Sequence, residues 1–224
     1  MKLKSFGCSF IFGTDLSDDG SSKDYFKHSQ LTWPSLLAKK LNLEYDCHAQ
    51  AGSGNLKILE TVLSQCENTE KNLYVIGWTW IDRFDYTNTE VRPWNPQGWK
   101  TMLPNDDSKQ AKFYYKNIHS QFRDKLVTLS YIKLAIHTLQ QKKCPFIMTF
   151  VDDLIFENTW HVTPAVIDMQ RYIRPFMSDF QGKNFVEWSR DKKFSMSRTM
   201  HPLEQAHAAA AELVHNDLDK WIKS

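Results

Sequence analysis

Short apolar runs alternate with longer amphipathic stretches along the whole chain. Apolar runs bounded by turn residues predict buried strands at 2–8, 43–49, 72–77 and 145–151. Between them apolar residues recur at helical spacing, most extensively over 118–142. Strands that alternate with helices are typical of a parallel sheet with helices on both faces. The pattern predicts a three-layer α/β protein, to which residues 184–188 could add a short fifth strand.

Two helix starts carry their own local signals. Thr32 precedes Trp33-Pro34, which predicts Thr32 as the N-cap and Pro34 in the first turn. Thr163-Pro164 predicts a further helix that runs through Tyr172 in the same way.

Two stretches lack a regular pattern. Residues 14–30 are rich in Asp and Ser and predict an exposed loop, which could form one wall of a site because it follows the first strand. Residues 84–115 contain three Pro residues and Gly98 together with Trp94 and Trp99, and predict a long loop insertion too aromatic to be disordered. The sequence predicts a single domain over 1–224, and both stretches lie within it.

Composition excludes several classes of function. With 28 Lys and Arg against 26 Asp and Glu, the net charge of +2 gives no electrostatic reason to expect a nucleic-acid or membrane partner. No apolar run approaches the ~18 residues of a spanning helix, and the N-terminus lacks a signal segment. The four Cys residues show neither a Cys-x-x-Cys pair nor a zinc spacing. We expect a cytoplasmic protein with reduced thiols and no metal or other cofactor.

Candidate chemistry begins where the first strand ends. The strand breaks at Gly7 into Cys8 and Ser9, which places a hydroxyl where open α/β sheets bind ligands. Cys8 is an alternative nucleophile, although strand alternation would point it away from Ser9. Gly52 follows the second strand and precedes a helix, so its backbone N–H could approach a substrate beside a helix N-terminus. Taken alone, the segment around Ser9 and the segment around Gly52 each also fit an ordinary strand-to-helix turn.

The other end of the chain supplies a possible base. His201-Pro202 stands before the last predicted helix, where a lone His is most often a cap or a surface residue. If Ser9 and His201 meet within hydrogen-bond distance, they suffice for nucleophilic acyl transfer.

These residues together resemble the SGNH (GDSL) hydrolase superfamily. Gly7-Cys8-Ser9-Phe10 resembles its first block, with Cys8 where Asp is usual. Gly52 matches the oxyanion-hole glycine of the second block, and His201-Pro202 with His207 matches the last block. The resemblance implies a flavodoxin-like parallel sheet of about five strands, Ser9 as nucleophile, and no cofactor.

Two blocks depart from the family pattern. Gly77-Trp78-Thr79 replaces the Gly-x-Asn of the third block, so the resemblance implies an oxyanion hole made by Ser9, Gly52 and Thr79. Arg198 stands where the family has the acid that orients the His. Asp191, the nearest acid before His201, is the candidate for that role.

The resemblance implies a small-molecule or carbohydrate ester as substrate, with an O-acetylated carbohydrate as first choice. Trp78, Trp80 and Asn55 are the candidate substrate-binding residues, although large aromatic side chains more often serve packing, here of the long loop. A weakened or inactive member that binds a glycan or a protein is the alternative. The chain also looks like SGNH-like proteins of tailed bacteriophages, an origin that would place it in the host cytoplasm or the virion.

Overall fold

The computed structural model describes residues 1–18, 27–66, 72–91, 95 and 97–223. Its main sheet has four parallel strands in the described residues, in the order β2-β1-β3-β6. Their bounds are β1 Lys2–Phe6, β2 Glu44–Cys47, β3 Asn72–Trp78 and β6 Phe146–Phe150. This is the flavodoxin-like order, so the predicted fold class is confirmed.

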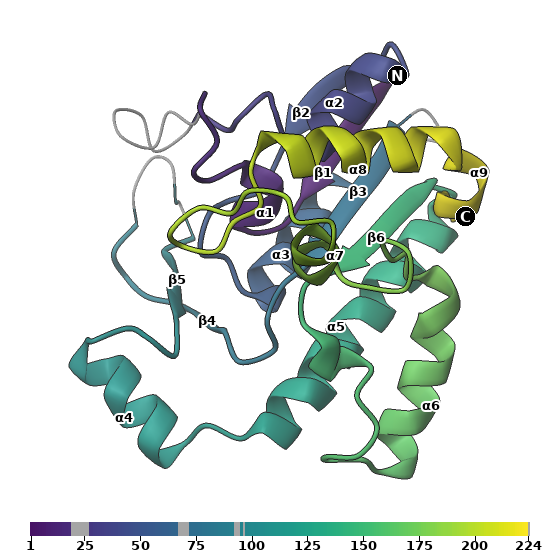
Figure 1. The fold of residues 1–224 in the computed structure, drawn as a ribbon. Helices are drawn as coiled ribbons and strands as arrows, with labels where there is room; N and C mark the ends of the chain where they lie inside the picture. The colour runs from purple at the N-terminus through teal and green to yellow at the C-terminus, as the bar shows by residue number, and fades with distance from the viewer. Residues whose placement is uncertain (19–26, 67–71, 92–94, 96, 224) are drawn as a thin grey trace.

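Helices cover both faces of this sheet (Figure 1). The helices are α1 Ser9–Phe12, α2 Trp33–Lys40, α3 Asn55–Gln65, α4 Lys109–Asn117, α5 Gln121–Gln141, α6 Pro164–Ile173, α7 Phe185–Asp191, α8 Glu204–Asn216 and α9 Leu218–Trp221. Within the described residues, none of these helices combines the length and apolar character needed to cross a membrane.

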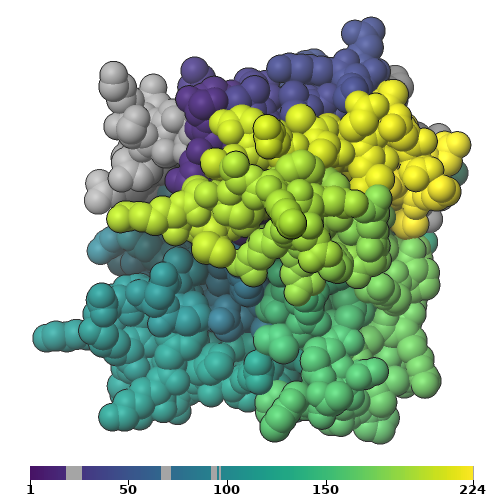
Figure 2. Space-filling view, viewed as in Figure 1, coloured from purple at the N-terminus to yellow at the C-terminus, as the bar shows by residue number. Residues whose placement is uncertain are grey.

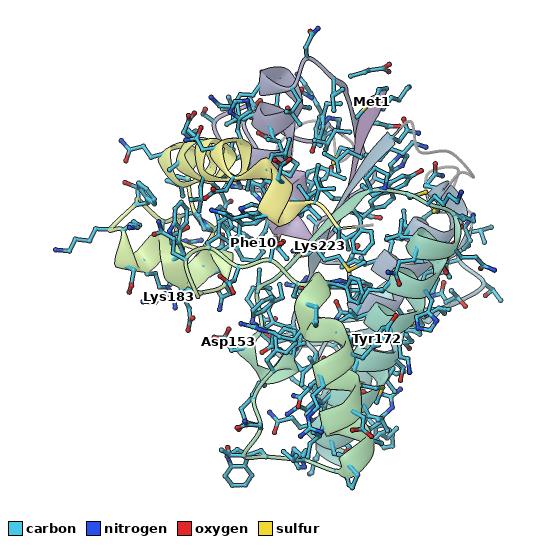
Figure 3. All side chains as sticks on the ribbon, turned by 90° about the vertical axis from the view of Figure 1, so that its right-hand side faces the viewer. Met1, Phe10, Asp153, Tyr172, Lys183 and Lys223 are labelled. Atoms are coloured by element: carbon cyan, nitrogen blue, oxygen red, sulfur yellow. The ribbon has the colours of Figure 1, made fainter. Side chains whose placement is uncertain are left out.

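Alternate residues of β3 enter two separate hydrophobic cores. Tyr74 and Ile76 pack with α3, α5 and α6, whereas Leu73 and Val75 pack with α2 and α8. All of β3 is buried, as expected for a central strand covered on both faces. Figure 3 shows α6, which carries Tyr172, beside α5 on the first of these faces.

Both predicted helix starts are found. Thr32 is the N-cap of α2, with Pro34 in the first turn, although its side chain makes no capping hydrogen bond. Thr163 caps α6 through its hydroxyl, which accepts a hydrogen bond from Val166 N at 3.3 Å.

The predicted fifth strand at 184–188 is wrong, because this segment forms the start of α7. Asn184 Oδ1 accepts hydrogen bonds from the backbone N–H groups of Val186 and Glu187, both at 3.0 Å, and so caps a helix at this position. Next to β6 the described residues make two isolated bridges, a parallel one between Met148 and Met177 and an antiparallel one between Phe146 and Lys223.

The predicted loop insertion at 84–115 is more regular than expected. Strand β4 (Phe84–Thr87) pairs antiparallel with β5 (Trp99–Met102), and α4 follows. The rings of Phe84 and Tyr114 stack at 4.4 Å between centroids and join α4 to this hairpin. The aromatic residues therefore order the segment by packing against each other; Trp94 lies outside the described residues.

Candidate active site

Ser9 lies at the carboxyl end of β1, as the first residue of the short helix α1. The turn into α1 requires a glycine, since a Cβ on Gly7 would lie 2.6 Å from Ile11 Cγ1 and 3.0 Å from Gly77 O. The close packing of Gly7 against β3 thus fixes where the Ser9 hydroxyl is presented. Cys8 is buried in the core, which argues against the alternative thiol nucleophile.

His201 reaches Ser9 from the loop before α8. Its Nε2 lies 2.8 Å from Ser9 Oγ, so the predicted pair is within hydrogen-bond distance. Ser197 holds the loop, since its Oγ accepts from His201 N at 3.1 Å and its N–H donates to His201 O at 2.9 Å. Met200 has a φ of 69°, an uncommon value for a non-glycine residue, in the turn that presents the imidazole.

The acid beside His201 is Asp15, and the prediction of Asp191 is wrong. Asp15 Oδ2 lies 2.8 Å from His201 Nδ1, on the opposite side of the ring from Ser9. Asp191 is at the end of α7, where its carboxylate pairs with Lys183 at the surface. Asp15 belongs to the polar segment predicted to wall the site; residues 19–26 of that segment lie outside the described residues.

Hydroxyl groups surround the Asp15 carboxylate. Ser197 Oγ donates to Asp15 Oδ2 at 2.7 Å, and Thr199 Oγ1 also donates to it. Burial tends to raise the pKa of Asp15, but the hydrogen bonds from Thr199, Ser197 and His201 outweigh it and hold the pKa below its usual value. A carboxylate that stays ionised fixes the His201 proton on Nδ1 and leaves Nε2 free to accept from Ser9.

Gly52 is the residue predicted to offer a backbone donor. It lies in the turn before α3, lines the same cleft as Ser9 and His201, and has a φ of 81° that suits glycine. A Cβ at Gly52 would meet no atom within 4 Å, so the backbone here faces open space. The backbone N–H of Ser9, the first residue of α1, has no acceptor within the helix and is a second available donor.

Thr79 does not join these donors. Its side chain is fully buried, and its Oγ1 has no hydrogen-bond partner among the described residues. It is also absent from the lining of the cleft, so the predicted third oxyanion donor is not in place.

Asn55 and Trp78 are structural residues, which corrects their prediction as substrate contacts. Asn55 Oδ1 accepts from Thr79 N at 2.9 Å, while its Nδ2 donates to Thr79 O at 3.1 Å and Trp80 O at 3.3 Å. Trp78 is fully buried among the side chains of the sheet and α5. The sequence showed the aromatic cluster but not which of its members faces the cleft.

The Ser9–His201 pair opens into a cleft of about 540 Å³. Its walls come from the loops after β2, β3 and β5, from α7 and from the His201 loop, and include Phe10, Ala51, Trp80, Arg83, Leu103, Val186 and Arg190. The space-filling view shows a hollow below the yellow-green chain, between the teal and green segments (Figure 2). Trp80 lines this cleft, and its ring centroid lies 5.4 Å from that of Phe10; its role in substrate binding stays a prediction.

No protein-family model matches the sequence, and no curated protein matches it. Solved structures do resemble the fold. A member of the lipolytic protein G-D-S-L family from Veillonella parvula has a TM-score of 0.53 at 10% identity, over 98% of both chains. An esterase from Pseudoalteromonas sp. has a TM-score of 0.53 at 9% identity, over 98% of this chain and 97% of that one.

A third structure is a carbohydrate esterase whose active site is described as having divergent catalytic and non-catalytic binding functions. Its TM-score is 0.55 at 15% identity, over 97% of this chain and 68% of that one. Identities this low establish the architecture alone. The chain has the α/β fold of the GDSL (SGNH) hydrolases.

Proposed function

We propose that this chain is a serine esterase of the SGNH superfamily that hydrolyses a small acyl ester. The observation that carries the proposal is the line of contacts from Ser9 Oγ through His201 to Asp15, with both hydrogen-bond distances at 2.8 Å. Such a line, open to a cleft at the carboxyl edge of a parallel sheet, is an arrangement that supports acyl transfer by a serine.

In the first half-reaction His201 Nε2 takes the proton of Ser9 Oγ as the oxygen attacks the ester carbonyl carbon. The resulting imidazolium donates through Nδ1 to Asp15, which stabilises its charge. When the tetrahedral intermediate collapses, His201 Nε2 gives the proton to the leaving alcohol oxygen, and the acyl group stays on Ser9.

In the second half-reaction His201 Nε2 takes a proton from a water molecule, which attacks the acyl carbon. Collapse of this intermediate breaks the bond to Ser9 Oγ, and His201 returns the proton to that oxygen. The carboxylic acid leaves, and the resting state of Ser9, His201 and Asp15 is restored.

The oxyanion of each intermediate would be bound by the backbone N–H groups of Ser9 and Gly52. Because Thr79 is buried, the third donor found in the family has no counterpart at that position. Losing one such donor costs on the order of a hundredfold in rate. We therefore propose a slow esterase rather than one of high turnover.

An acetyl group on a carbohydrate is the proposed substrate class. Trp80 lines the cleft beside the catalytic pair, where an aromatic side chain can contact a sugar, and the carbohydrate esterase of the same fold supports the class without establishing it.

Hydrolysis of p-nitrophenyl acetate and of acetylated sugars, by the native chain and by Ser9→Ala, tests the proposal. We expect the variant to lose all activity above background. Equal rates for the two proteins would reject Ser9 as a nucleophile and would favour a glycan- or protein-binding role.

A further inference from the structure

Two arginines line the cleft that contains Ser9 and His201. Arg83 follows β3, and Arg190 lies in the last turn of α7. Neither forms an ion pair with any residue in the described part of the chain, whereas Arg123 and Arg174 pair with Asp124 and Asp179. The cleft beside the proposed catalytic centre thus contains two guanidinium groups that no carboxylate of the described residues contacts directly.

Arg83 is held in a fixed position but keeps donors free. Its guanidinium stacks on Trp80, with Cζ 4.8 Å from the ring centroid, and Nη1 donates to Ser53 O at 2.9 Å. Stacking uses the face of the guanidinium, and one hydrogen bond uses only one of its five N–H groups. The remaining N–H groups lie in the plane of a half-buried, preorganised cation.

Among the residues that line this cleft, Asp82 is the acid that stands against the two arginines. Asp82 also lines the cleft, and burial raises its pKa against the opposing effect of Arg83. Glu187, on the same helix as Arg190, is not among the residues that line this cleft; burial and a hydrogen bond with Asp153 raise its pKa, while Arg190 acts in the opposite direction. Even with Asp82 ionised, the two arginines leave the lining of the cleft with an excess of positive charge.

We infer that the cleft binds an ester that also carries an anionic oxygen group, a carboxylate or a phosphate, and that Arg83 and Arg190 bind this group. The planar N–H fork of arginine matches both anions, and charge-assisted hydrogen bonds are the stronger class. The inference rests on the proposed function, because it names the substrate of the same cleft.

Three matched esters test it: acetylated glucose, acetylated glucuronic acid and acetylated glucose 6-phosphate. We expect kcat/KM to be about tenfold or more higher for at least one anionic ester than for the neutral one at low salt, and the preference to shrink as salt rises. The two anionic esters distinguish carboxylate from phosphate as the group that is recognised.

Arg190→Gln should lower the anionic-to-neutral ratio of kcat/KM by up to about fivefold, as expected for an exposed charge. Arg83→Gln should lower it by about tenfold or more, and Arg83→Lys should restore part of it. Arg83 also donates to Ser53 O, and a disturbance of that turn would change kcat/KM for all three esters alike. The anionic-to-neutral ratio of kcat/KM therefore reports charge recognition separately. The control Arg198→Gln removes an exposed arginine outside the cleft and should leave the ratio unchanged.

Failure of the inference and failure of the proposed function are distinguishable. Hydrolysis that depends on Ser9 but shows no preference for an anionic ester overturns the inference and leaves the function in place. If no ester is hydrolysed, calorimetric titration with glucuronate, glucose 6-phosphate and glucose tests the cleft directly. Binding of an anion that Arg83→Gln weakens supports the inference, whereas equal binding of all three, or of none, overturns it.

Discussion

Asp15 and His201 are 186 residues apart in the sequence, yet Asp15 Oδ2 lies 2.8 Å from His201 Nδ1. The acid therefore comes from the segment that follows the nucleophile, while the imidazole comes from the loop before α8. Thr199, from the His201 loop, contacts both partners, since its hydroxyl donates to Asp15 and lies 2.9 Å from His201 Nδ1. The two ends of the chain are joined at the site itself.

This relationship predicts that Asp15→Asn lowers kcat by about a thousandfold to ten-thousandfold, because the carboxylate no longer selects the His201 tautomer or stabilises the imidazolium. The measurement is kcat with p-nitrophenyl acetate. Asp191→Asn is the matched control and should leave kcat unchanged, since Asp191 contacts Lys183 instead. The opposite ranking of the two variants would restore Asp191 as the orienting acid.

Thr79→Val should be neutral or stabilising by up to about 1 kcal/mol in the free energy of unfolding, because it replaces a buried hydroxyl that lacks a partner in the described residues. Urea unfolding measures the change. Thr101→Val provides the contrast: it removes a 2.6 Å bond to the buried Asp85 and should cost about 1 to 3 kcal/mol. Esterase activity that falls on the order of a hundredfold in Thr79→Val would instead show that Thr79 serves the oxyanion.

Asn55→Ala should destabilise the fold by about 2 to 4 kcal/mol, because it leaves the buried backbone of Thr79 without its paired donor and acceptor. Asn117→Ala is the control, since Asn117 makes a single exposed bond to Phe113 O and should change stability by less than about 0.5 kcal/mol. Chemical denaturation of both variants measures the effect. A stable Asn55→Ala protein with a raised KM would favour the original prediction that Asn55 contacts substrate.

His207 predicts a pH dependence of stability. Its ring is fully buried, its Nδ1 accepts from Trp33 N at 3.1 Å, and burial lowers its pKa from 6.5 to about 3. Between these two values the unfolded chain binds a proton that the folded chain does not, so stability falls as the pH drops below 6.5. The contribution approaches a slope of about 1.4 kcal/mol per pH unit.

His207→Gln removes the titrating group and should flatten the plot of unfolding free energy against pH over this interval. His215→Gln, on the same helix, is the control and should keep the slope of the native protein. Parallel plots for His207→Gln and the native chain would contradict the proposed linkage.

Much of the fold followed from local patterns. The apolar runs that form β1, β3 and β6, and the Thr and Pro residues that start α2 and α6, are patterns of residues close in sequence, so the sequence alone indicated them. The prediction of a strand at 184–188 failed because the apolar residues of this segment fit a strand as well as a helix. A capping interaction, in which Asn184 Oδ1 accepts from two backbone N–H groups, marks it as a helix start.

At the site, the sequence by itself determined Ser9, Gly52 and His201 as candidates, because a strand end, a glycine turn and a helix start are each marked by local residue types. Only the tertiary structure decided that Asp15 rather than Asp191 contacts His201, and that Thr79 is buried while Trp80 and Arg83 face the cleft. The physical reason is that pairing and exposure depend on distances between side chains from different elements. Many acids along a chain have the right chemistry, but only the folded chain brings one of them within 2.8 Å of a particular nitrogen.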